Sequence, residues 1–232
     1  VNNEIGTIQN IEEIAKKIKE KNKDTIFHTD AVQAFGKINI NVKNIDLMSV
    51  SGHKIHSLKG IGFLYIKKGI RSNKIIFGAS QQNNVRSGTI NNEGIISLAS
   101  ASKLAYENIN EKYEKVKAIR NEIIKLKNLL EGTSVNGDEE NGLPYILSLS
   151  FENVKGEVLL HALEDKEIYV STGSACSNKG KRELSTIDYV AKENVGSTIR
   201  ISFSSENTIE EAKNFNEVIL QIVPMLRMYQ KR

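Results

Sequence analysis

The sequence predicts an α/β protein of two parts, and three patterns lead to this prediction. Short apolar runs alternate with a helical pattern over the first part of the 232-residue chain. A long amphipathic helical pattern then begins at Ile109, and short strand-like and helical segments follow it. An order of strand, helix and strand favours an open, mostly parallel sheet. We therefore predict a larger domain over residues 1–108 and a smaller α+β domain over residues 109–232.

In the first part, one helix and three strands are predicted. Residues 11–21 carry apolar side chains at positions 11, 14, 15 and 18, which is a helical spacing. The predicted strands are TIFHTDA, IDLMSVS and GIGFLYIKK, at residues 25–31, 45–51 and 60–68. Ligands of open α/β sheets bind beyond the carboxyl ends of the strands, so we expect a site next to Asp30 and SGHK.

In the second part, apolar residues recur in steps of three or four from Ile109 to Leu130, which predicts a long amphipathic helix. A final helix is expected to begin with a capping box of Thr208 and Glu211, and Pro224 should kink or interrupt it. One more helix is predicted between these two, at residues 156–165. Three strands are also predicted there: YILSLSF, IYVST and STIRISFS.

The net charge, the length of the apolar runs and the numbers of cysteine and histidine residues exclude several classes of function. A net charge of +4, spread along the chain, is too mild to indicate direct nucleic-acid binding. No apolar run approaches the roughly 18 residues of a membrane helix. One cysteine and four scattered histidines predict neither a disulfide framework nor a metal site. We expect a cytoplasmic protein, and the opening on Val1 without a visible leader suggests a fragment or a processed form.

Lys54 in the stretch SGHK is the first candidate for chemistry. An ordinary lysine has a pKa of about 10.4 and is a poor nucleophile at neutral pH. Burial or a neighbouring positive charge lowers that pKa and frees the amine for Schiff-base formation. The alternative is a solvated lysine in a turn, and this stretch alone does not decide between the two.

Asp30 is the second candidate, at the end of a predicted strand that we expect to be buried. A buried carboxylate needs a partner, and one recurrent partner is the protonated ring nitrogen of pyridoxal phosphate. Gln33, three residues further on, offers an amide donor. The alternative for Asp30 is a helix N-cap, a position at which aspartate is favoured.

Three further stretches carry polar groups that suit a site. The hydroxyl and amides of RSGT, residues 86–89, precede a helical pattern and suit either a phosphate site or a simple capping turn. Cys176 lies in STGSACSNKGK, where nearby cations would lower the thiol pKa, so a reactive cysteine is favoured over a structural one. Arg200 lies on a strand with Ile199 and Ile201 facing the other way, and suits either a carboxylate ligand or an exposed edge charge.

In combination these stretches resemble the NifS/IscS-type cysteine desulfurases. The resemblance rests on VNNEIG, HTDAVQAFGK, DLMSVSGHKIHSLKGIGFLYI, RSGT, STGSACS and STIRISFS, in this order along nearly the whole chain. These enzymes belong to the class-V aminotransferases and have the pyridoxal-phosphate-dependent fold type I. The chain resembles roughly the last three-fifths of such an enzyme and lacks the upstream half of the large domain.

The resemblance implies a role for each candidate. Lys54 would hold the cofactor covalently, Asp30 would pair with its ring nitrogen, Arg200 would bind the substrate carboxylate and Cys176 would attack the substrate sulfur. The remaining cofactor ligands would be Ser51 and His53 at the phosphate, Gln33 and Asn3 at the ring hydroxyl, and Thr89, which would reach the phosphate of the partner subunit's site.

The implied activity is the pyridoxal-phosphate-dependent removal of sulfur from L-cysteine, which gives alanine and a persulfide on Cys176. The resemblance also implies a homodimer and a protein sulfur acceptor, such as an iron–sulfur scaffold or a tRNA-thiolation protein. Two alternatives remain at this point. One is a selenocysteine lyase or another fold-type-I enzyme, and the other is a truncated, non-catalytic copy that acts as a dimerisation or sulfur-scaffold protein.

Overall fold

The computed structural model describes residues 1–172 and 185–230, which form two compact units. One unit is residues 9–109, and the other combines residues 1–8 with residues 110–232. The first eight residues therefore belong with the C-terminal part of the chain, although they were predicted to belong with residues 9–108. The assignment of the two parts as a cofactor domain and a small domain stays a prediction.

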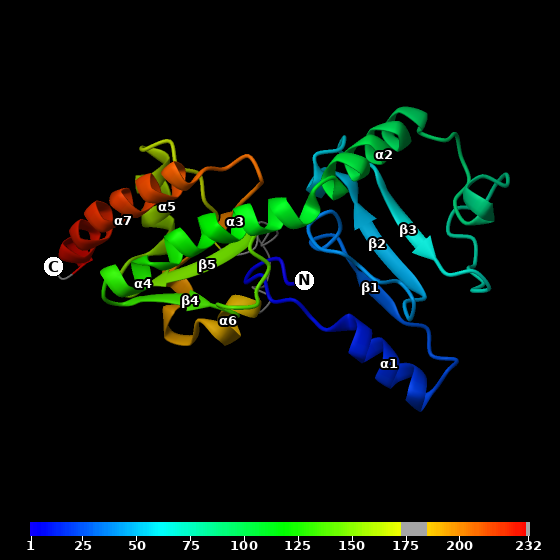
Figure 1. Cartoon of the computed structure of the whole chain (residues 1–232), viewed down its shortest axis with the longest axis horizontal. Coiled ribbons are helices and arrows are strands. Elements are labelled where there is room, and N and C mark those ends of the chain that lie inside the picture. The colour runs from blue at the N-terminus through cyan, green and yellow to red at the C-terminus, as the bar shows by residue number, and fades with distance from the viewer. Residues whose placement is uncertain (173–184, 231–232) are drawn as a thin grey trace. The chain divides into compact units, whose positions relative to one another are not determined.

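The unit of residues 9–109 holds two α-helices, two short 3₁₀ helices and a three-stranded sheet (Figure 1). Asn10 caps its first helix by accepting a hydrogen bond from the backbone N–H of Glu13. In chain order the elements are α1 (Ile11–Lys21), β1 (His28–Asp30), β2 (Leu47–Ser51), a 3₁₀ helix (Gly52–Ile55), β3 (Gly62–Ile66), a 3₁₀ helix (Gln82–Asn84) and α2 (Asn92–Tyr106).

The sheet of this unit has the strand order β1-β2-β3. β1 and β2 are parallel, with His28 opposite Leu47, whereas β2 and β3 are antiparallel, with Ser51 opposite Gly62. Ten residues and no crossover helix join β2 to β3, and so short a connection permits only the antiparallel pairing. Because β1 and β2 are parallel, their carboxyl ends lie at the same edge of the sheet.

Helix α2 packs against the 3₁₀ helix that follows β2. Ile55, at the end of that 3₁₀ helix, is buried in a cluster with Leu98 and Ala101 of α2. The hydroxyl group of Ser97 adds a hydrogen bond to that of Ser57, at an O–O distance of 3.0 Å, and accepts one from the backbone N–H of Leu58. The backbone on both sides of the SGHK stretch is thus fixed by packing and hydrogen bonds.

The second unit, which comprises residues 1–8 and 110–232, contains an antiparallel sheet of order β4-β5-β6 covered by helices. All six residues of β5 are buried, because helices and neighbouring strands cover it. In chain order its elements are α3 (Ile109–Ile124), α4 (Leu126–Leu129), β4 (Thr133–Asn136), β5 (Ile146–Phe151), α5 (Gly156–Glu164), α6 (Thr186–Val190), a 3₁₀ helix (Lys192–Ser197), β6 (Thr198–Ser202) and α7 (Ile209–Gln230).

The largest hydrophobic core of the described residues joins this sheet to helices α3, α4, α5 and α7. Leu149 and Phe151 of β5, Leu159 of α5 and Ile219 of α7 are fully buried in it. Burial of a large apolar side chain contributes about 1.5–3 kcal/mol, so this cluster supplies much of the stability of the unit.

One prediction for this unit is wrong, and of the two effects expected of Pro224 the interruption does not occur. The stretch IYVST forms no regular strand, since only Ser171 pairs with a neighbour, in an isolated bridge to Arg200. Pro224 does not interrupt the final helix, which runs without a break from Ile209 to Gln230. The apolar face of α7 packs on the core on both sides of the proline: Ile219, Ile222 and Val223 are buried before it, and Leu226 after it is partly buried against the same core. This packing outweighs the single lost hydrogen bond.

Among the residues that the structure describes, no helix is long and apolar enough to cross a membrane.

Candidate active site

The first group of candidate residues lies at the carboxyl edge formed by β1 and β2. Asp30 ends β1 and pairs with Ser49, while Ser51 ends β2. The backbone N–H of Ala31 donates to the carbonyl oxygen of Ser49 at 2.9 Å, which holds the exit from β1 against β2. The expectation that Asp30 and the SGHK stretch meet at one edge of a sheet is therefore confirmed for these residues.

Ser51 and His53 form a pair of polar groups at this edge. The Ser51 Oγ and the His53 Nδ1 are 2.8 Å apart, a hydrogen-bond distance. The His53 side chain is exposed and projects from the 3₁₀ helix that begins at Gly52. A hydroxyl and an imidazole next to a tight helical turn suit the recognition of an anion.

Lys54 is exposed, so burial does not set its chemistry in this chain. Its ammonium group makes no hydrogen bond or ion pair with the residues that the structure describes. Its charge acts on the neighbouring Lys37. Burial lowers the pKa of Lys37 to about 8, and the charge of Lys54 lowers it in the same direction.

Asp30 is also exposed, and the expectation of a buried strand beneath it is wrong. β1 has only three residues and lies at the edge of the described sheet, where solvent reaches it. The Asp30 carboxylate accepts a hydrogen bond from the backbone N–H of Val32 at 2.8 Å and so caps a turn over residues 32–38. The N-cap alternative thus holds in part, since the capped segment is a turn and not a regular helix.

Gln33 lies in that same turn, and its amide oxygen accepts a hydrogen bond from the Lys37 Nζ at 3.3 Å. This hydrogen bond uses only the amide oxygen of Gln33, so its NH₂ group can donate to a different acceptor. Lys37 was not singled out from the sequence, although it follows Gln33 by four residues. In a helical turn a spacing of four residues brings two side chains together, and this spacing was the signal that could have found it.

Thr89 is exposed in the loop that precedes α2. The RSGT stretch lies before α2, a helix that was not predicted, since the predicted helical pattern begins only at Ile109. The cap of that helix is Asn91, whose side-chain oxygen accepts a hydrogen bond from the backbone N–H of Gly94 at 2.9 Å. Because Asn91 serves as the cap, the hydroxyl group of Thr89 is not needed for that purpose.

Arg200 and Asn3 come together in the second unit. Ile199 and Ile201 of β6 are buried and Arg200 between them is half-buried, as the alternating pattern predicted. The Arg200 Nη1 donates a hydrogen bond to the backbone carbonyl of Asn3 at 3.2 Å, and its Nη2 lies 3.4 Å from the Ser171 Oγ. The Arg200 Nε is buried and has no hydrogen-bond partner among the described residues, whereas the Asn3 side chain is exposed.

Cys176 lies outside the residues that the structure describes, as do the neighbouring cations Lys179, Lys181 and Arg182. Their predicted chemistry stays a prediction.

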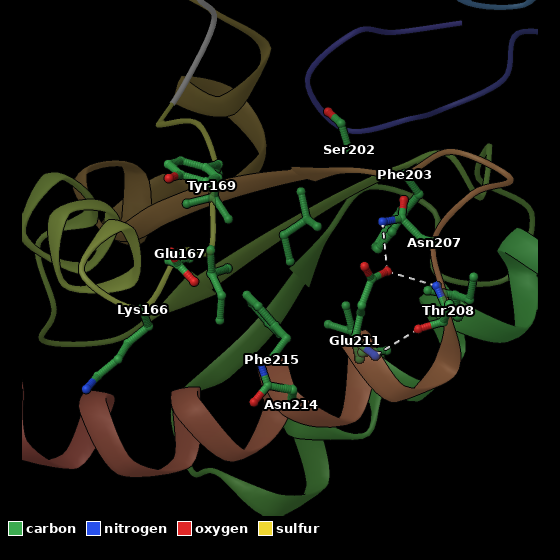
Figure 2. Close-up of a pocket in the computed structure, with 16 residues that line it drawn as sticks. Lys166, Glu167, Tyr169, Ser202, Phe203, Asn207, Thr208, Glu211, Asn214 and Phe215 are labelled. Carbon is green, nitrogen blue, oxygen red and sulfur yellow. Dashed lines mark hydrogen bonds between the residues drawn. The ribbon is translucent and has the colours of Figure 1, made fainter.

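The second unit also contains a pocket of about 360 Å³ next to the start of α7. Figure 2 shows Glu211 reaching Asn207 and Thr208 at its rim, and the backbone N–H groups of Thr208 and Glu211 complete the predicted capping box. The hydrogen bond from Thr208 lowers the pKa of Glu211 most, and that from Asn207 lowers it further. None of the predicted site residues that the structure describes lines this pocket.

Comparison with known proteins defines the class of this chain. Residues 1–215 match the family model described as aminotransferase class-V, so the chain belongs to that family. The fold agrees, because the structure matches a solved NifS-like protein with a TM-score of 0.86 and 37% identity over 97% of this chain. The predicted fold class, a pyridoxal-phosphate-dependent transferase of fold type I, is confirmed.

Within that family, the relatives are of the NifS/IscS type. The relative named IscS 1 of Bacillus subtilis is 42% identical, and the cysteine desulfurase IscS of Methanosarcina thermophila is 40% identical, each over 97% of this chain. A NifS-like protein from Rickettsia africae matches in structure with a TM-score of 0.82 and 32% identity. The resemblance to NifS/IscS-type cysteine desulfurases is thereby confirmed.

The chain spans only part of each of these proteins. It covers 60% of the Bacillus subtilis relative, 56% of the Methanosarcina thermophila relative and 60% of both solved NifS-like chains.

Proposed function

We propose that the protein is a pyridoxal-phosphate-dependent cysteine desulfurase, which removes sulfur from L-cysteine to give alanine and a persulfide on Cys176. The observation that carries the proposal is the set of groups at the carboxyl edge of β1 and β2. An exposed lysine without a hydrogen bond or ion pair to the described residues, an exposed carboxylate and a hydroxyl–imidazole pair come together there. A solved relative that is 28% identical, named SspA, was determined in complex with cysteine.

This set of groups fits the cofactor. A cofactor with a phosphate, a ring nitrogen and an aldehyde needs an anion-binding pair, a carboxylate and a free amine, and the edge offers one of each. Ser51 and His53 would bind the phosphate, and Asp30 would pair with the ring nitrogen. Lys54 would bind the aldehyde carbon covalently. Gln33 and Asn3 would bind the ring hydroxyl, and Thr89 would contribute to the partner subunit's phosphate site.

When bound, pyridoxal phosphate supplies an electron sink for the electron pair released at the substrate α-carbon. The remaining work falls to the chain. The carboxylate of Asp30 would keep the ring nitrogen protonated, and the guanidinium of Arg200 would bind and orient the substrate carboxylate. The amine of Lys54 would be available to hold or move a proton at the substrate α-carbon.

Sulfur transfer is assigned to Cys176. Its thiolate attacks the sulfur of L-cysteine, a sulfur–sulfur bond forms and the carbon–sulfur bond of the substrate breaks. The electron pair of the broken bond stays with the carbon skeleton, which takes up a proton and leaves as alanine. The product on the protein is a Cys176 persulfide, and no external oxidant is required.

We further propose a homodimer in the cytoplasm, where reducing conditions keep a nucleophilic thiol free. Exposed apolar side chains support a dimer contact in the unit of residues 9–109, among them Ile75, Phe77 and Ile96. The sulfur acceptor would be another protein, either an iron–sulfur scaffold or a component of tRNA thiolation. L-cysteine is the proposed substrate.

The test is peptide mass mapping of the complete gene product after exposure to L-cysteine without reductant. We expect the Cys176 peptide to gain one sulfur atom and alanine to form in equal amount. The matched controls are Cys176→Ser, which should abolish the added sulfur, and Lys54→Ala, which should abolish both products.

An unmodified Cys176 in a protein that carries the cofactor on Lys54 would overturn the proposal in favour of another reaction on the same fold. Release of selenide from selenocysteine without reaction of L-cysteine would instead support a selenocysteine lyase. Failure of the complete protein to bind the cofactor would support the non-catalytic alternative.

A further inference from the structure

Glu4 is a buried acidic residue that is not one of the proposed site residues. It is only 5% exposed, although it lies in the short N-terminal segment VNNEIG. Its carboxylate accepts a hydrogen bond at 3.1 Å from the backbone N–H of Ile187, which is 183 residues away in the sequence. A buried carboxylate is costly unless it is hydrogen-bonded, so this contact has a reason to be retained.

The contact with Ile187 caps helix α6. The first N–H groups of a helix have no acceptor within the helix, and a nearby carboxylate satisfies one of them while also complementing the helix dipole. Asp188 supplies a second hydrogen bond at this end by accepting from the backbone N–H of Ser185 at 2.7 Å. The side chain of Asn2 donates to the Thr186 Oγ1 at 3.0 Å, so the N-terminal segment holds α6 at two adjacent residues.

The segment itself is a closed turn. The side-chain oxygen of Asn2 accepts hydrogen bonds from the backbone N–H groups of Glu4 at 2.8 Å and Ile5 at 3.0 Å. The backbone N–H of Gly6 donates to the carbonyl of Asn2 at 3.1 Å. Ile5 is buried in a cluster with Ile187 and Ala191, so apolar packing supports the same contact with α6.

Gly6 shows how closely the turn lies on the rest of its unit. Its φ is +74°, and a Cβ at this position would lie 3.0 Å from the carbonyl oxygen of Ile146. Only glycine accepts both the backbone angle and the close approach. The turn is therefore fixed at both ends, by α6 on one side and by the start of β5 on the other.

Asn3 is the residue that this fixed turn presents. Its backbone carbonyl accepts the hydrogen bond from the Arg200 guanidinium, while its side chain is exposed. In the described part of the chain, the only other hydrogen-bond partner of that guanidinium is the Ser171 Oγ, at a longer distance of 3.4 Å. The orientation of Arg200 consequently depends on the position of the Asn3 carbonyl.

We propose that Glu4 is a positioning residue: by capping α6 it fixes the Asn2–Ile5 turn, so that Asn3 orients Arg200 for the substrate carboxylate. This inference rests on the proposed function for the roles of Asn3 and Arg200. Glu4 itself touches neither substrate nor cofactor. Its effect is therefore expected mainly on substrate binding, and through the Asn3 side chain on cofactor binding.

The experiment compares Glu4→Ala and Glu4→Gln in the complete protein. Alanine removes the acceptor, whereas glutamine keeps a side-chain oxygen of the same reach and should act as the rescuing conservative variant. Glu157→Ala is the matched control, because Glu157 also lies in a first helical turn of the same unit but is exposed. Four quantities are measured: the hydrogen-exchange rate of the Ile187 amide, KM and kcat for L-cysteine, and the dissociation constant of pyridoxal phosphate.

We expect Glu4→Ala to speed exchange of the Ile187 amide about tenfold, the factor that corresponds to ~1.4 kcal/mol. We also expect it to raise KM for L-cysteine at least about threefold with a smaller change in kcat, since uniform binding is what a misplaced Arg200 would lose. Glu4→Gln and Glu157→Ala should stay within about twofold of the unaltered protein in the exchange rate, in KM and kcat, and in the dissociation constant of pyridoxal phosphate. If Glu4→Ala does not fold, Glu4→Asp replaces it with the same expectations, because its carboxylate is one methylene shorter.

Two outcomes would overturn the proposal. One is faster exchange at Ile187 with unchanged KM and cofactor binding, which would make Glu4 a helix cap and nothing more. The other is a glutamine variant that keeps Ile187 protected but loses substrate affinity as the alanine variant does. If the unaltered protein makes no alanine from L-cysteine, the proposed function fails, while the exchange and cofactor-binding measurements still test Glu4.

Discussion

Two lysines of like charge share the edge where the candidate site lies. Lys37 is half-buried and donates to Gln33, and Lys54 is exposed without a hydrogen bond to the described residues. Burial lowers the pKa of Lys37 to about 8, and the repulsion by Lys54 adds to this effect. The charge of Lys37 is therefore sensitive to its surroundings near physiological pH.

This pKa leads to a prediction for the cofactor-free protein. The Lys37 side chain should titrate near pH 8 when it is followed by NMR of its terminal groups, and Lys54→Ala should raise that pKa toward the ordinary value. Between pH 8 and about 10.5 the unfolded chain then binds more protons at Lys37 than the folded one, so the contribution of this residue to the free energy of unfolding rises with pH. A Lys37 that titrates near its ordinary value in both proteins would contradict the prediction.

At the residue scale the roles assigned from the sequence stay predictions, whereas the environment of the same residues can be compared with the structure. Residue types and their order led to Lys54, Asp30 and Arg200, but the expected burial of Asp30 is wrong. Glu4 was missed for a different reason: its partner, Ile187, is 183 residues away, and no local pattern reports such a contact. Burial and long-range hydrogen bonds are products of tertiary packing, which the local sequence does not encode.

At the scale of elements, α1 is tied to the sheet by one buried charge. The Asp46 carboxylate, just before β2, is 3% exposed and forms an ion pair with Lys19 of α1, whose side chain is 23% exposed. The same carboxylate accepts a hydrogen bond from the backbone N–H of Phe27 at 2.9 Å. Burial alone would raise the pKa of Asp46, but the hydrogen bonds from Lys19 and Phe27 outweigh it and the pKa is lowered.

We predict that Asp46→Asn lowers the free energy of unfolding by about 2 kcal/mol, because it leaves Lys19 without its charged partner while it keeps an acceptor for Phe27. Since the folded pKa of Asp46 lies below the unfolded value, its contribution is present above about pH 4 and is lost as pH falls further. Denaturant titrations at several pH values measure both effects.

The control for this prediction is Glu20→Gln, which removes an exposed pair with Lys16 on the same helix. Exposed pairs contribute little, so its free energy of unfolding should change by less than about 0.5 kcal/mol. An Asp46→Asn variant no less stable than this control would refute the anchoring role of Asp46.

Periodicity predicted elements best where one face of the segment is buried. The predicted helix at residues 11–21 coincides with α1, and the capping box of Thr208 and Glu211 starts α7 as expected. The stretch IYVST has the composition of a strand but pairs only at Ser171, because strand formation needs a neighbour in register and composition does not supply one. α2 was missed since its mixture of small and apolar residues carries a weak helical period.

At the scale of the whole molecule, the exposed apolar side chains of residues 9–109 have the chemistry of an interface. Phe77 is 83% exposed, and Ile75 and Ile96 are also exposed. Exposed apolar groups of this size often mark sites of protein contact. A second copy of the chain is the occupant that the proposed function implies, because Thr89 in the same unit would serve the partner's phosphate site.

We predict that Phe77→Asp shifts the complete protein from dimer toward monomer, because a charge placed in an apolar contact must be desolvated. Light scattering coupled to size-exclusion chromatography measures the mass directly. Tyr229→Asp is the control, since Tyr229 is an exposed aromatic residue at the end of α7 in the other unit, and it should leave the mass unchanged. An unchanged dimer in Phe77→Asp would place the contact elsewhere.

The packing of residues 1–8 with residues 110–232 has a consequence for how the protein is made. During synthesis the continuous unit of residues 9–109 leaves the ribosome before residues 110–232, and at that stage the VNNEIG turn has no partner yet. At about 5–20 residues per second, roughly 10–40 s pass before Ile187 follows Glu4 out of the ribosome, 183 residues later. The turn that orients Arg200 is thus among the last parts of the chain to reach its native contacts, although it is translated before them.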